Sequence, residues 1–119
     1  SKDFEMIIKI PLQHNGEIIT IDWQADKTKT PGLVVHKSVT VNGNKEPLVI
    51  TQPWSTRPYW TITHETTGRA IFHQIETKKG ALQVARELGN LDWTKIPKTK
   101  KEAMPYKRLK NKIVKEFGL

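Results

Sequence analysis

Residues 3–23 alternate between apolar and polar side chains, which predicts a β-hairpin. Asn15-Gly16 is typical of a two-residue type I′ turn, in which both central residues need positive φ angles. Pairing outward from this turn places four large apolar side chains on one face: Ile8, Ile10, Ile21 and Trp23. Lys9 and Asp22 fall on the other face, so the hairpin has one side suited to a core and one suited to solvent.

A second hairpin is predicted to begin with the apolar run Leu33-Val34-Val35, which suggests burial on both faces of the strand. Asn42-Gly43 would provide its turn. Pro47 in the returning strand indicates a sheet edge or a break. Residues 51–58, with two prolines, are interpreted as the next loop.

A third hairpin over residues 59–75 turns at Thr66-Thr67-Gly68, with Gly68 in the left-handed conformation. This register pairs Ile62 with Phe72, Trp60 with Gln74 and His64 with Ala70. One face then carries Trp60, Ile62, Ala70 and Phe72. The other face carries Tyr59, Thr61, Thr63, Ile71, His73 and Ile75.

Two helices are predicted after the strands. The first covers residues 78–89, with Thr77 as N-cap, Gly89 as terminator and an apolar stripe of Ala81, Val84, Ala85 and Leu88. Residues 95–105 form a basic linker. After Pro105 a second helix is expected, with Tyr106, Leu109, Ile113 and Phe117 on the side that docks on the sheet, and Lys107, Arg108, Lys112 and Lys115 on the other.

The order of elements predicts an α+β fold, in which antiparallel β-hairpins form a curved sheet with a helix packed on one face, plus a basic C-terminal helix. A small closed barrel is the alternative. The 119 residues suit a single compact unit. Within it we distinguish a β-rich domain over residues 1–94, with its helix at 78–89, from a basic linker and helix over residues 95–119.

Charge is distributed unevenly along the chain. Residues 1–94 hold 11 basic and 10 acidic side chains, whereas residues 95–119 hold 9 basic and 2 acidic ones, a net charge of +7 out of +8 for the whole chain. Such a segment is typical of polyanion-binding proteins. A solvated tail is the other interpretation, and we favour nucleic acid because both the density and the sign of the charge are extreme.

The chain contains no cysteine, which excludes disulfides, thiolate chemistry and cysteine-ligated zinc. No apolar run approaches the roughly 20 residues that span a bilayer, and no signal-peptide pattern opens the chain. We therefore expect a cytoplasmic protein without a membrane partner, and leave homo-oligomerisation open.

Common enzyme motifs are absent, among them phosphate-binding loops, dinucleotide fingerprints and nucleophile elbows. Glu76-Thr77-Lys78 is similar to the Glu-x-Lys triplet of metal-dependent nucleases, which need two carboxylates converging on Mg²⁺. Glu65, the nearest upstream acid, lies at the far turn, so we interpret the triplet as a strand end and a helix cap. His64 and His73 point to opposite faces and cannot share a metal. We expect no catalytic residue, cofactor or metal.

Aromatic and basic residues interleave around the third hairpin, as in proteins that stack unpaired bases on a sheet and hold phosphates with cations. The hydroxyl-rich face of that hairpin would contact bases, and the C-terminal segment would neutralise phosphates. The candidate nucleic-acid-binding residues are Trp54, Arg57, Tyr59, Thr61, Arg69, His73, Lys78, Lys79, Lys98, Lys100, Lys101, Lys107, Arg108, Lys112 and Lys115.

The pattern W-x-x-T-H-x-x-T-G at residues 60–68, followed by an Ala/Leu-rich helix, resembles a hairpin-helix module of small uncharacterised proteins from phages and other mobile elements. The similarity covers residues 31–94 and includes "PGLVVHKSV". The strands followed by "TKKGAL" and a helix also resemble the Whirly and transcriptional-coactivator family of single-stranded-DNA binders, although six candidate strands stand here against four there. These resemblances imply a class of protein and assign no site residue.

The sequence thus predicts a non-enzymatic nucleic-acid-binding protein, with single-stranded DNA as its partner and a phage or mobile element as its source. A protein-binding module of the host-takeover or inhibitor type, docking through its basic C-terminal helix, is the alternative. A metal-dependent nuclease is the third hypothesis.

Overall fold

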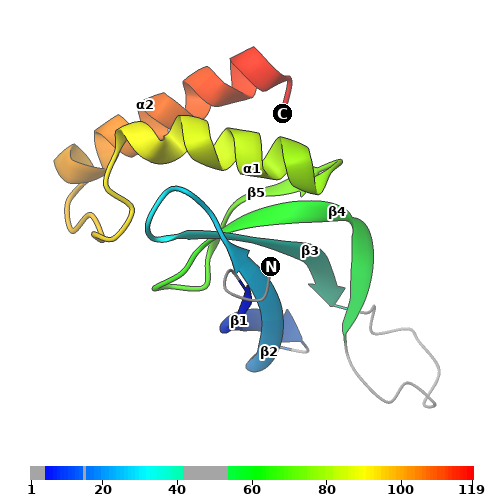
Figure 1. Cartoon of the computed structure of the whole chain (residues 1–119). Coiled ribbons are helices and arrows are strands. Elements are labelled where there is room, and N and C mark those ends of the chain that lie inside the picture. Colours follow the sequence, from blue (N-terminus) through cyan, green and yellow to red (C-terminus); the bar gives the residue numbers. More distant parts are fainter. Residues whose placement is uncertain (1–4, 15, 42–53) are drawn as a thin grey trace, which may run out of the picture.

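A computed structural model describes residues 5–14, 16–41 and 54–119. Five strands form one antiparallel sheet in the order of the sequence: β1 (Glu5–His14), β2 (Glu17–Lys27), β3 (Leu33–Val41), β4 (Trp54–His64) and β5 (Ala70–Ile75). They are followed by α1 (Lys78–Glu87), the 3₁₀ turn η2 (Leu88–Asn90) and α2 (Lys100–Phe117) (Figure 1). The predicted α+β class is confirmed. Among the described residues β1 and β5 do not pair, so the sheet is open and the closed barrel is wrong.

The first hairpin has the predicted register, with Ile8 opposite Trp23 and Ile10 opposite Ile21. Gly16 takes a φ of 79°, as the turn requires, while Asn15 lies outside the described residues. On the exposed face Lys9 Nζ lies 2.8 Å from Asp22 Oδ1. Both side chains are mostly exposed, so this ion pair contributes little to stability. The hairpin is therefore held by its ladder and its apolar face.

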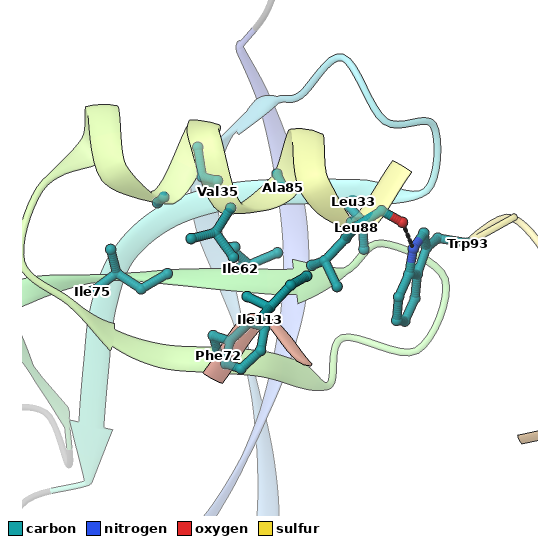
Figure 2. Close-up of a cluster of buried hydrophobic side chains, with 11 residues drawn as sticks. Leu33, Val35, Ile62, Phe72, Ile75, Ala85, Leu88, Trp93 and Ile113 are labelled. Atoms are coloured by element: carbon teal, nitrogen blue, oxygen red, sulfur yellow. Dashed lines mark hydrogen bonds between the residues drawn. The ribbon is translucent and has the colours of Figure 1, made fainter. Parts of the chain in front are cut away.

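Strand β3 separates two cores, because successive side chains of a strand point to opposite faces. Leu33 and Val35 face α1 and α2 (Figure 2), whereas Val34 faces β1 and β2. All three are at most 1% exposed, which confirms the predicted burial on both faces. The helix-side core adds Ile62, Phe72, Ile75, Ala81, Val84, Ala85, Leu88, Trp93 and Ile113. The opposite core adds Ile8, Ile10, Ile21 and Ala25.

Strand β4 pairs directly with β3, from Val41 opposite Trp54 to Leu33 opposite His64. The predicted loop over residues 51–58 is therefore wrong from Trp54 onward, since that part is strand. Two prolines suggested a loop, but tertiary pairing decides the conformation of such a segment. The predicted turn at Asn42-Gly43 and the break at Pro47 lie outside the described residues.

The third hairpin keeps the predicted pair of Ile62 with Phe72, but its register shifts on both sides of this pair. Trp60 lies opposite Ile75 rather than Gln74, and Ala70 lies opposite Thr63 rather than His64. Bulges of this kind insert a residue and turn the following side chains to the other face. Ile75 consequently belongs to the helix-side core, not to the face of Thr61 as predicted.

Helix α1 begins as predicted, because the Thr77 hydroxyl accepts a hydrogen bond from the Gly80 amide at 2.9 Å. Its predicted apolar stripe is buried against the sheet. Gly89 does follow the C-cap residue Leu88, yet the chain continues there as the η2 turn. A Cβ at Gly89 would lie 2.8 Å from the Thr30 hydroxyl, so glycine permits a close approach at this point.

Helix α2 begins at Lys100, earlier than predicted, since Pro105 lies inside the helix and does not start it. The Thr99 hydroxyl accepts from the Glu102 amide at 3.1 Å, and the Glu102 carboxylate accepts from the Lys98 amide at 2.7 Å. These bonds satisfy amides at the helix start in the manner of a capping box. Residues 100–105 of the predicted linker are therefore helical.

The predicted docking side of α2 does face the sheet. Ile113 is 1% exposed within the helix-side core, and Tyr106, Leu109 and Phe117 pack around it. Residues 95–119 thus share a core with the β-rich part, and α2 lies beside α1 on the same side of the sheet (Figure 1). Of the helices in the described part of the chain, none is long and apolar enough to cross a membrane.

Trp93 links the sheet to both helices. Its indole Nε1 donates to the Leu88 carbonyl at 2.7 Å (Figure 2), and its ring meets Tyr106 of α2 edge-on at a centroid distance of 4.8 Å. Its own carbonyl accepts from His64 Nε2 at 2.7 Å. Gly32 passes so close that a Cβ there would overlap this carbonyl.

We expect Gly32→Ala to destabilise the protein by more than about 3 kcal/mol, because the added methyl group overlaps backbone atoms of Trp93 at a φ of 92°. Gly16→Ala is the matched control: its φ is 79°, but its Cβ would meet nothing within 4 Å. The free energy of unfolding of the control should fall only by the conformational cost of a non-glycine residue at positive φ, about 1–2 kcal/mol. Urea unfolding of both variants measures the difference, and equal losses would contradict the contact.

Candidate nucleic-acid interface

An open cleft of about 640 Å³ lies where the two edge strands of the sheet approach each other. Ile10, Pro11 and Leu12 of β1 form one side of it, and His73 and Gln74 of β5 lie on the other. The turn before β5 closes one end, since a Cβ on Gly68 would lie 2.6 Å from the Lys9 carbonyl oxygen. We call this feature the edge cleft.

The floor of the edge cleft is polar and comes from β3 and β4. His36 Nε2 lies 2.7 Å from the Thr63 hydroxyl, and the Ser38 hydroxyl lies 2.7 Å from the Thr61 hydroxyl. All four side chains are buried. Thr61 was predicted to contact bases on an exposed sheet face, but it is 4% exposed and hydrogen-bonded within the floor. Its role is to build the cleft.

Burial lowers the pKa of His36, and the hydrogen bond to the Lys37 carbonyl only partly opposes this effect. The ring is therefore neutral at pH 7. Because a carbonyl can only accept, Nδ1 carries the proton and donates to Lys37 O at 2.7 Å. Nε2 must then accept from the Thr63 hydroxyl, which fixes the direction of the His36–Thr63 hydrogen bond.

The rim of the edge cleft holds three residues that the sequence singled out: Tyr59, Arg69 and His73. Arg69 and His73 are exposed and Tyr59 is half-buried. No carboxylate is among the described residues that line the cleft, so Arg69 gives it a positive rim. This combination favours an anionic ligand.

A second surface lies on α2. Its seven basic and two acidic side chains give the helix a net charge of +5. Lys101, Arg108, Lys112 and Lys115 recur at intervals of seven, four and three residues, so they lie along one exposed side, which we call the cationic stripe. Among the described residues, Glu116 is the carboxylate that pairs with this stripe: its Oε1 lies 3.9 Å from Lys112 Nζ.

The structure thus separates two groups of residues that the sequence placed in one interface. Tyr59, Arg69 and His73 line a cleft that β1 helps to form. The cationic stripe lies on α2, which packs beside α1 on the helix side of the sheet (Figure 1). Four further cations of the C-terminal segment are also exposed: Lys98, Lys100, Lys107 and Lys95. Trp54 and Arg57 lie on β4, and their side chains lie outside the described residues.

Lys78 at the start of α1 has a structural partner. Its Nζ lies 2.5 Å from Asp26 Oδ2 and 5.7 Å from the centre of the Trp60 ring. These contacts explain a cation at a helix N-terminus, where the helix dipole is unfavourable to it. Lys79 beside it is exposed.

The Glu76-Thr77-Lys78 triplet has the geometry of a strand end and a helix cap. Thr77 is the N-cap of α1, and Lys78 pairs with Asp26. Within residues 5–14, 16–41 and 54–119, no three potential ligands among histidine, aspartate and glutamate come together as a metal site requires. His64 contacts Trp93 on the helix side, whereas His73 lines the edge cleft.

Sequence reasoning missed the floor residues contributed by β3. His36 and Ser38 follow the apolar run at the alternate positions that continue the face of Val34. Along this face of the buried strand, the side chains change from valine to an imidazole and then to a hydroxyl. This change could have indicated a polar site beside the strand. Comparisons with known proteins add no guide to function, because no protein-family model, curated protein or solved structure matches this chain.

The lowered pKa of His36 predicts that folding stability falls in mild acid. Below the ordinary value of 6.5 the unfolded chain takes up a proton that the folded chain resists, so stability decreases as pH falls from 6.5 toward the folded pKa. Urea unfolding at about pH 7.5 and about pH 5.5 measures this loss. His36→Gln should reduce the pH dependence, and His73→Gln, at an exposed position, should retain it. An unchanged pH dependence in His36→Gln would show that other groups cause it.

Proposed function

We propose that this protein binds nucleic acid, with single-stranded DNA as the favoured form, and catalyses no reaction on it. The observation that carries the proposal is the cationic stripe on a helix whose opposite side is fixed in the core by Ile113. The cations are therefore held in a row by an ordered element.

From Lys101 to Lys115 the stripe extends about 21 Å at 1.5 Å per residue, which is long enough to contact several phosphates. Each phosphate contact releases condensed counterions, so binding gains affinity from the solvent ions and weakens with salt. The stripe contains lysine and arginine without aromatic residues between them. Such a surface contacts the phosphate backbone of a nucleic acid and does not distinguish base sequences.

Single strands fit the separation of the two surfaces. The protein measures 46 × 36 × 27 Å, with the cationic stripe and the edge cleft on different sides of the sheet. A duplex is stiff over such distances, whereas a single strand bends freely enough to follow a protein surface. Unstacked bases are also available to a cleft only in a single strand.

The test replaces two cations of the stripe, Arg108→Gln with Lys112→Gln, and compares this variant with the control Lys27→Gln with Lys29→Gln. Both variants lose two positive charges at exposed positions. Fluorescence anisotropy with a labelled single-stranded oligonucleotide should show severalfold weaker binding for the α2 variant alone. Its salt dependence should be less steep by about 1.4, since each contact to a single strand contributes about 0.7 to the slope.

Equal effects of the two variants would show that net charge alone attracts the oligonucleotide, and no binding at low salt would overturn the proposal. Binding to an acidic protein that survives nuclease treatment would then identify the stripe as a protein-docking surface. Deleting residues 95–119 is an unsuitable test, because it removes Ile113 from the core.

A further inference from the structure

We propose that the edge cleft binds a single nucleotide, with the base inside the cleft and the phosphate at Arg69. The choice of ligand class rests on the proposed function, but the cleft is a separate site from the cationic stripe. It is built by β1, β3, β4, β5 and the turn at Gly68.

The polar floor of the edge cleft supports a polar ligand. On the same face of β3, Val34 packs against Ile10 and Ala25 in an apolar core, yet two residues farther along the strand His36 replaces it. Buried polar groups cost free energy that their mutual hydrogen bonds only offset, and an apolar pair would pack there equally well. Four polar side chains gathered under a cleft are therefore explained by a polar ligand above them.

The shape and charge of the edge cleft match those of a nucleotide. Pro11, Leu12 and Val39 supply apolar walls, and the Tyr59 ring lies at the rim. A volume of about 640 Å³ lies in the range of sites for small organic molecules. A planar, partly apolar body with hydrogen-bonding edges, joined to an anion, fits these walls, the hydroxyl-rich floor and the Arg69 guanidinium. Nucleoside monophosphates have this chemistry.

Exposed side chains of β5 would recognise the base. The exposed side chains of Gln74 and His73 stand beside the floor, and an amide can donate to and accept from the edge of a base. Such groups adjust to more than one base. We therefore expect the cleft to discriminate weakly between the four nucleotides and strongly against the nucleoside, which lacks the phosphate.

The test is a titration of the ¹⁵N-labelled full chain, followed by NMR amide shifts, with each 5′-monophosphate, the corresponding nucleosides and inorganic phosphate. Millimolar nucleotide should shift amides of β4 and β5 around Tyr59, Ala70 and His73. Arg69→Gln should weaken nucleotide binding about tenfold, because it removes a charge-assisted contact, and should leave nucleoside binding unchanged. The spectrum itself reports that this exposed substitution preserves the fold.

The ligand can come from free nucleotides or from a strand, and a short oligothymidylate distinguishes them. Shifts with monophosphates support a free nucleotide, whereas shifts of the same amides with the oligonucleotide alone support an unstacked nucleotide of a strand. No shift with either ligand, or equal shifts with inorganic phosphate, would overturn the proposal. The double variant Arg108→Gln with Lys112→Gln should leave monophosphate binding unchanged. The experiment therefore distinguishes a wrong proposal for the edge cleft from a wrong proposal for the cationic stripe.

Discussion

Trp93 sits at the junction of four segments of the chain, and the placement of both candidate surfaces depends on its contacts. Its indole donates to the end of α1 and packs against Tyr106, which fixes where α2 crosses the sheet. Its carbonyl accepts from His64 at the end of β4, while Gly32 passes against it at the start of β3. The strands that form the floor of the edge cleft and the helix that carries the cationic stripe therefore meet at one residue.

Because side chains alternate along β3 and β4, the two faces of the sheet have different functions in the structure. Val35 and Ile62 join the helices in an apolar core, whereas His36 and Thr63, one position farther along each strand, form a hydrogen-bonded pair on the other face. A shift of one residue in either strand would exchange these sets. The same register thus determines both the stability of the helix layer and the polarity of the cleft.

Much of this arrangement could be predicted from the sequence where a turn fixes the register. Asn15-Gly16 sets every pair of the first hairpin, and Thr77 defines the start of α1. The bulges between β4 and β5, which accompany the burial of Ile75 in the core, could not be predicted, because the turn residues at 66–68 do not specify them. Trp93 was missed since it lies in no periodic segment. The candidate cations were found, but their separation from the cleft depends on how α2 docks, which local patterns do not encode.

Pro11 and Gly68 affect whether a strand of a second molecule can pair with the edge of β1. The closing pair of a two-residue hairpin, here His14 with Glu17, is hydrogen-bonded, so Pro11 opposite Thr20 falls at a position whose missing amide would point away from β2. Beside it, the turn at Gly68 covers the Lys9 carbonyl. A strand from another molecule would find no donor at Pro11 and a covered acceptor at Lys9, which disfavours edge-to-edge pairing at this part of β1. At the other end of the strand order, β5 is an edge strand of six residues.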